Sequence, residues 1–116
     1  MLFMLIVKAS KNSERGNLPS AALMEAMSRY NEELIAAGVR IMAKGLHPSS
    51  NAIKITYPLD SEPVITEGPF DPPHAIVAGF ILIEVDSREE ALKWALRMPD
   101  PQGFGEGEIE MRQVFD

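Results

Sequence analysis

The sequence predicts a single-domain α+β fold in which helices cover one face of an antiparallel sheet. Two apolar runs, Leu2 to Val7 and Ile76 to Val85, have the length and composition of strands buried on both faces. Each run precedes a segment whose apolar residues recur at helical spacing. The chain has 116 residues, of which 46% are hydrophobic, and this is enough for one domain with its own core.

Composition excludes several classes of function. The chain has no cysteine, which excludes a disulfide scaffold, a thiolate zinc site, an iron–sulfur cluster and a cysteine nucleophile. It has 11 Lys and Arg against 17 Asp and Glu, and this acidic balance argues against direct nucleic-acid binding. No basic residue precedes the first apolar run, and no run approaches the ~20 residues of a membrane helix. We therefore expect a cytoplasmic protein with no membrane partner.

The first helix has signals at both ends. Ser20 is a typical N-cap residue, and Gly38 is suited to the position just after the helix. Between them one apolar stripe is formed by Leu23, Met27, Tyr30 and Leu34.

The middle of the chain predicts a strand and an inserted hairpin. Val39 to Ala43 reads as a strand, and the loop Lys44 to Ser50 follows it. Ala52 to Tyr57 alternates apolar and polar residues, as a half-exposed strand does. Pro63 to Thr66 pairs back on it, with Pro58 to Glu62 as the turn.

The last part of the chain predicts a helix and a strand after the Ile76–Val85 run. Ser87 and Glu90 have the spacing of a capping box, and Pro99 stops the helix. The glycine-rich segment 103–107 is interpreted as a flexible link, and Glu108 to Phe115 alternates like a final strand.

This order predicts a ferredoxin-like βαββαβ sheet with an inserted β-hairpin. The first and third core strands are central in that topology, and they are the two segments that look apolar on both faces. Two helices cover only one face of such a sheet. Because large exposed apolar patches are rare on monomers, we expect a homodimer that packs through the open sheet face.

Seven segments of the chain form a recognisable ordered set: residues 30–34, 37–39, 45–50, 66–70, 78–80, 90–95 and 108–112. Together they resemble the YCII-related proteins, specifically the subfamily named for a DGPF motif. The resemblance implies a dimeric ferredoxin-like α/β barrel spanning residues 1–116. It also implies a regulatory context, because members are often encoded beside sigma factors.

The chain departs from the family pattern at three places. Glu67 stands where the motif has Asp, which keeps the charge and adds one methylene. The usual Ala-Glu-Thr-Lys-Glu after the motif is replaced by residues 71–75, Asp-Pro-Pro-His-Ala. Some members are credited with a His–Asp pair whose histidine lies on the first helix, and Met27 occupies that position here. That pair does not carry over.

The candidate catalytic residues lie in two loops. The chain has two histidines, His47 and His74, and histidine is suited to proton transfer near neutral pH. Asp71 and Glu67 precede His74 and could orient an imidazole. The alternative is that these are surface residues without a shared site. A metal site made of these four side chains is a weaker hypothesis, because their spacing matches no metal motif.

The candidate ligand-binding residues are Ser49, Ser50 and Phe70, which could supply polar and apolar walls of a pocket. The loops that end one strand and begin its antiparallel neighbour lie at the same edge of a sheet. We therefore expect a cleft between them near the dimer interface, with the hairpin as a flap over it. The alternative is that the loops pack together only to close the end of the barrel.

Two functions follow from the sequence. The first is a cofactor-independent acid–base enzyme, a lyase or isomerase that acts on a small polar organic molecule. The second is a non-catalytic ligand-binding or regulatory protein that associates with a sigma factor. No phosphate-binding or dinucleotide motif is present in a suitable context, so we expect no cofactor.

Overall fold

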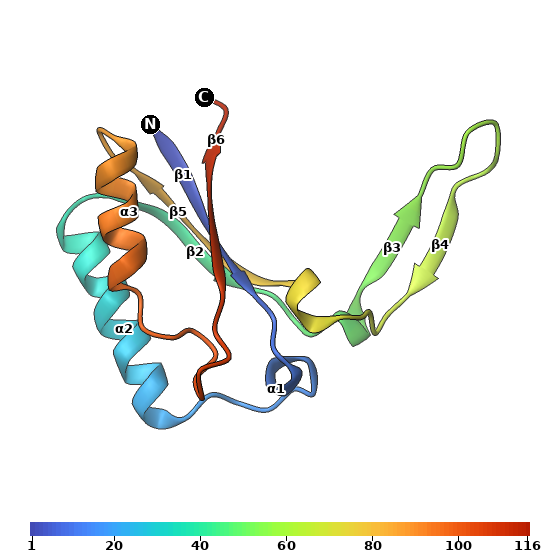
Figure 1. Ribbon diagram of the computed structural model, residues 1–116, viewed down its shortest axis with the longest axis horizontal. Helices are drawn as coiled ribbons and strands as arrows, with labels where there is room; N and C mark the ends of the chain where they lie inside the picture. The colour runs from blue at the N-terminus through green and yellow to red at the C-terminus, as the bar shows by residue number, and fades with distance from the viewer.

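The computed structural model describes residues 1–116 and contains one four-stranded sheet, one separate hairpin and three α-helices (Figure 1). In chain order the elements are β1 (Leu2–Lys8), α1 (Lys11–Glu14), α2 (Ala21–Ala36), β2 (Arg40–Gly45), η1 (Ser49–Asn51), β3 (Ile53–Thr56), β4 (Val64–Glu67), η2 (Pro73–Ala75), β5 (Val77–Glu84), α3 (Arg88–Arg97) and β6 (Ile109–Val114).

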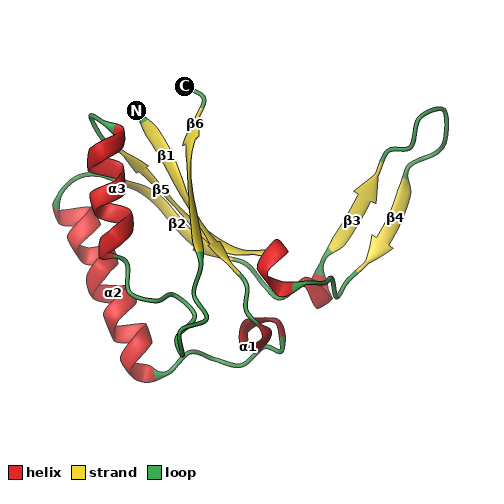
Figure 2. Ribbon diagram, viewed as in Figure 1, coloured by secondary structure: helices red, strands yellow, loops and turns green.

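The four-stranded sheet has the order β2-β5-β1-β6, and every neighbouring pair is antiparallel. The two most apolar strands, β1 and β5, are therefore central, which confirms that prediction. Helices α2 and α3 lie together on one face, and no helix lies on the other (Figure 2). The structure is thus an α+β fold.

The predicted N-caps of α2 and α3 are confirmed, but the capping box predicted at Ser87 and Glu90 is only half formed, because the Glu90 side chain accepts the Asp86 N–H instead of the Ser87 N–H. The Ser20 Oγ accepts the Leu23 N–H at 3.1 Å, and the Ser87 Oγ accepts the Glu90 N–H at 3.1 Å. Gly38 has a φ of +73°, a conformation that glycine adopts without strain. None of the helices is both long enough and apolar enough to cross a bilayer.

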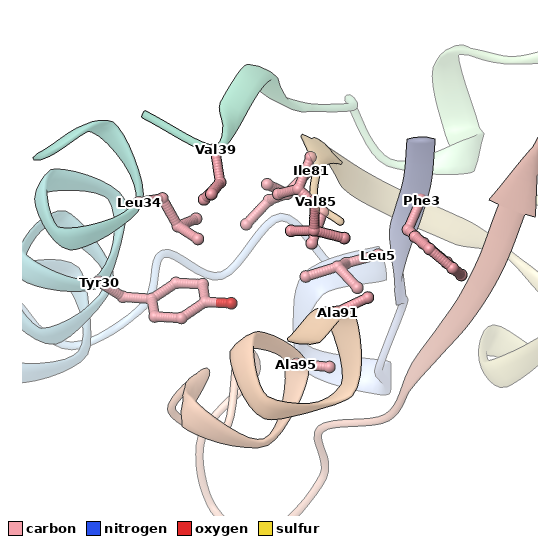
Figure 3. Close-up of a cluster of buried hydrophobic side chains, with 10 residues drawn as sticks. Phe3, Leu5, Tyr30, Leu34, Val39, Ile81, Val85, Ala91 and Ala95 are labelled. Carbon is pink, nitrogen blue, oxygen red and sulfur yellow. The ribbon is translucent and has the colours of Figure 1, made fainter. Parts of the chain in front are cut away.

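The core lies between the sheet and the two long helices (Figure 3). The Tyr30 hydroxyl donates a hydrogen bond to the Trp94 carbonyl oxygen at 2.6 Å, which joins α2 to α3. Burial of the phenol, opposed by nearby Arg97 and reinforced by Glu33, raises the Tyr30 pKa to about 12. The buried cluster consists of Phe3, Leu5, Tyr30, Leu34, Val39, Ile81, Ile83, Val85, Ala91 and Ala95.

Two local structures complete the fold. Lys11 to Glu14, for which the sequence analysis made no prediction, forms the short helix α1, because Ser10 and Ser13 cap each other through side chain and backbone. The glycine-rich segment 103–107, expected to be a flexible link, belongs to a turn organised by the Asp100 carboxylate. That carboxylate accepts the backbone N–H groups of Gln102, Gly103 and Gly105.

The hairpin β3–β4 forms as predicted, but it does not fold back as the predicted flap over the sheet edge where the two loops meet. It projects away from the body on the side that the helices leave open (Figure 1). The strands pair only with each other, and all eight of their residues are exposed, including those expected to be half-buried. We call residues 53–67 the arm.

The uncovered face of the sheet, which we call the open face, has an apolar centre. Register places Met4, Ile6, Phe80 and Leu82 there, with Met42 and Val114 beside them. Charged side chains surround this centre: Lys44, Glu84, Glu110 and Arg112. The barrel arrangement and the dimer remain predictions at this point.

Candidate functional site

The two loops expected to meet at one sheet edge do meet, and Ser49 lies at the junction. The Gly68 N–H donates to the Ala52 carbonyl oxygen at 2.9 Å. The Phe70 N–H donates to the Ser49 Oγ, also at 2.9 Å. A Cβ on Gly68 would lie 1.7 Å from the Ser49 carbonyl oxygen, so only glycine allows this approach. The close approach fixes the second loop against the first.

Glu14 supports this junction from α1. Its Oε2 accepts the Ser49 N–H at 2.9 Å, and its Oε1 accepts a short hydrogen bond from the Ser49 hydroxyl. Ser49 is only 3% exposed, so its hydroxyl is fully engaged between a carboxylate and the Phe70 N–H. Sequence reasoning missed Glu14, because its partner is 35 residues away and no local motif marks it.

A cleft of about 410 Å³ opens beside this junction. His47 and Asp71 lie along it and are both exposed. Lys54 lines it from the arm, and its Nζ lies 4.4 Å from the centroid of the Phe70 ring. The cleft therefore combines an imidazole, a carboxylate and an ammonium group with apolar surface, which is contributed by Leu46, Ala52, Phe70, Ala75, Ile76 and Val77.

The remaining candidate residues lie elsewhere. His74 lines a different cavity, together with Ala9, Ser10, Lys11, Pro73 and Glu106. Glu67 ends β4 opposite Ile53 and is exposed, and Ser50 is exposed on η1. The structure thus brings His47, Ser49, Phe70 and Asp71 to one cleft and leaves the other three outside it. Asp71 shares a cleft with His47 and not with His74.

No group of three or more His, Asp and Glu side chains lies close enough to hold a metal ion. The four residues considered as ligands are split between separate places, as described above. The geometry therefore does not assemble the hypothetical metal site.

A second cavity of about 470 Å³ lies between α2 and the sheet. Met27 and Asn31 line it from α2, and Leu46 lines both this cavity and the His47 cleft. No histidine or carboxylate is among its lining residues. Met27 contributes a thioether to it, so this cavity has no imidazole for proton transfer. The acid–base groups lie in the His47 cleft instead.

Comparison with known proteins identifies the family of the chain. No curated protein matches the chain. The family model of the YCII-related domain matches residues 1–116, which is the whole of the chain described here. The chain therefore belongs to the YCII-related domain family.

Proposed function

We propose that the protein binds a small organic acid in the His47 cleft and that His47 carries out proton transfer on it. The observation that supports this most strongly is that His47 and Asp71 line one cleft with apolar surface. An imidazole can take up and return a proton near neutral pH. Asp71 lines the same cleft and supplies a carboxylate that can orient the imidazole.

The lining residues support an acidic ligand with a short carbon skeleton. Lys54 supplies a positive charge at the arm side of the cleft, and Leu46, Ile76 and Val77 supply apolar contacts. Proton abstraction next to a carbonyl, followed by return of the proton at another position, is the reaction of an isomerase. The same abstraction followed by loss of a leaving group from the neighbouring carbon, with formation of a double bond, is the reaction of a lyase. These side chains could support that step by acid–base chemistry alone.

Binding without chemistry is the second candidate function. His47 and Asp71 are both exposed, so water is not excluded from them in a single chain. Such a cleft is suited to a regulatory protein that senses a metabolite and then contacts a transcription factor, such as a sigma factor.

Hydrogen–deuterium exchange on candidate ligands separates the two functions. Purified protein is mixed in D₂O with short 2-oxo acids such as pyruvate and 2-oxobutyrate, and their amides serve as uncharged controls. Binding is followed by saturation-transfer NMR, and loss of the proton beside the carbonyl is followed by one-dimensional NMR. The proposal predicts binding of at least one acid and catalysed exchange.

Two variants make the assignment specific. His47→Ala is expected to abolish exchange, whereas His74→Ala is expected to leave it unchanged, because His74 lines a different cavity. Binding that depends on Lys54 but shows no exchange supports the second function. Equal loss in both histidine variants, or no binding of any acid, contradicts the proposed site.

We also propose that the chain belongs to the DGPF-motif subfamily, on the strength of residues 67–70, Glu-Gly-Pro-Phe. The contacts of these residues give the motif a physical role. Gly68 allows contact with the Ser49 carbonyl, and Phe70 bonds to Ser49 and lies under Lys54. The acidic residue at the first position ends β4.

For the assembly we propose a homodimer that packs through the open face. An apolar centre surrounded by charged side chains is the usual anatomy of a protein interface. The surrounding charges include two of each sign, so a two-fold axis can bring opposite charges together. Sedimentation velocity tests this directly, and a monomer at high micromolar concentration would contradict it.

A further inference from the structure

The arm has one apolar face and one largely polar face. In the β3–β4 register Ile55 lies opposite Ile65, so both point to the same side. Ile53 is on that side too, opposite Glu67, which is the one charged residue of this face and lies at its end next to the body. We call these three isoleucines the arm's apolar face. Ile53 is 62% exposed, Ile55 is 47% exposed and Ile65 is 66% exposed. Lys54, Thr56 and Thr66 lie on the opposite face with Val64.

Such an arm is not expected to be stable in isolation. A two-stranded hairpin alone is at best marginally stable in water. Here the arm touches the body only at its base, through the Gly68–Ala52 hydrogen bond and the contacts of Phe70. Its turn carries further apolar side chains, Tyr57 and Leu59, which are also exposed. A docking surface is therefore missing from the single chain.

The size of the exposed surface indicates what is missing. The accessible surface is 7928 Å². A compact monomer of 12.8 kDa has about 6,300 Å², so this chain carries an excess of about 1,650 Å². The radius of gyration is 15.9 Å, against about 13 Å for a compact domain of this length. Covering that excess on two chains would bury about 3,300 Å², which is typical of an obligate homodimer.

We propose that the apolar face of the arm docks on a second copy of this chain. This proposal extends the homodimer given under the proposed function, which concerns the open face alone. In the proposed dimer each arm packs on its partner, so that the isoleucines and the sheet face are buried by the same molecule. Each arm thereby contributes to the contacts that hold the two chains together.

A second copy fits better than an unrelated partner for two reasons. The arm and the open face lie on the same side of the molecule, away from the helices, so one partner can contact both (Figures 1 and 2). Both surfaces occur on every copy, and a two-fold axis uses each of them twice.

The docking also acts on the His47 cleft, because the two faces of the arm have different roles. Ala52 and Lys54 line the cleft, and Lys54 projects from the face opposite the isoleucines. Contacts on the apolar face therefore hold the strand that presents Lys54 to the cleft. Dimerisation and the shape of the cleft are linked through this one element.

Two neighbouring substitutions test the face that docks. Ile65→Asp and Thr66→Asp add the same charge to the same exposed strand, but on opposite faces. Burying an unpaired carboxylate in an apolar contact is costly, and a symmetric dimer would bury it twice. Sedimentation velocity should therefore show dimer dissociation constants raised by about 100-fold or more for Ile65→Asp and little changed for Thr66→Asp. Leu96→Asp, at a 77% exposed position on α3, serves as a further control.

Hydrogen exchange by mass spectrometry provides a second readout that needs no ligand. Segments 46–54 and 68–77 should lose protection in Ile65→Asp and keep it in Thr66→Asp, while the core strands stay protected in both. Equal dimerisation of the two variants would overturn the docking, and so would a wild-type monomer. A dissociated Ile65→Asp variant with unchanged exchange in the cleft segments would overturn the link to the cleft. Neither readout depends on the organic acid. A failure of the docking can therefore be distinguished from a failure of the proposed catalytic function.

Discussion

Replacing Ser49 by alanine removes the hydroxyl that joins three segments of the chain. In the wild type this hydroxyl donates to the Glu14 carboxylate and accepts the Phe70 N–H at 2.9 Å. Alanine fits the same space but leaves both groups without that partner. The Glu14 carboxylate keeps only its bond from the Ser49 N–H, and the Phe70 N–H has no other hydrogen bond.

The magnitude follows from these two losses. A buried donor left unpaired costs about 1–3 kcal/mol, and a hydrogen bond to a charged group contributes about 1.5–3 kcal/mol. Glu14 and Phe70 are both half-buried, and water can replace part of each lost bond, so we expect a total of about 2–4 kcal/mol. For a chain of this length that corresponds to a decrease in Tm of about 8–16 °C.

The assay is thermal and urea unfolding followed by circular dichroism, with Ser50→Ala as the matched control. Ser50 is the next residue but is exposed, so its loss should change stability by less than about 0.5 kcal/mol. Combining Ser49→Ala with Glu14→Gln should give a coupling energy of about 1–2 kcal/mol. Equal effects of the two serine variants would refute the role assigned to the junction.

Two further substitutions test other parts of the fold. Gly68→Ala should destabilise the protein by more than about 2 kcal/mol in urea unfolding, because its Cβ would lie 1.7 Å from the Ser49 carbonyl oxygen. Gly45→Ala should not destabilise the protein in this way, because its Cβ would meet nothing within 4 Å. Equal losses of stability in the two glycine variants would contradict the predicted clash. Tyr30→Phe should lower stability at neutral pH by about 1 kcal/mol through loss of the bond to Trp94. Because burial raises the Tyr30 pKa from 10.0 to about 12, its phenol favours the folded state below pH 10, and that contribution is lost as the pH rises toward 12. The decline in stability between pH 10 and 12 should therefore be shallower in Tyr30→Phe than in wild type.

The sheet and helices could be predicted because their signals are local. Ser20 and Ser87 cap helices through residues three positions away, and the apolar runs of β1 and β5 mark the central strands directly. The order of elements then leaves few antiparallel arrangements. These features depend on hydrophobic pattern and backbone chemistry, both of which can be read along the chain.

The site was only partly predictable, because its contacts join residues far apart in sequence. Strand order placed Ser49 and Phe70 at one edge, and they are indeed hydrogen-bonded. Strand order gave no information on side-chain direction, so it could not separate His47 from His74, which line different cavities. The direction of the arm was missed for the same reason, since the alternation in Ile53 to Thr56 shows two faces but not what covers them.

The cleft and the core consist of different side chains, so the effect of a substitution on proton exchange can be separated from its effect on stability. None of the residues lining the His47 cleft belongs to the buried cluster formed by β1, β5, α2 and α3. His47 is also exposed, so replacing it by alanine removes no core packing. We expect His47→Ala to change the unfolding free energy by less than about 0.5 kcal/mol, as exposed substitutions usually do. A loss of proton exchange in a variant of unchanged stability would then report on chemistry alone. If His47→Ala instead lowered stability by more than about 1 kcal/mol, the imidazole would have a structural role, and lost activity could no longer be assigned to it.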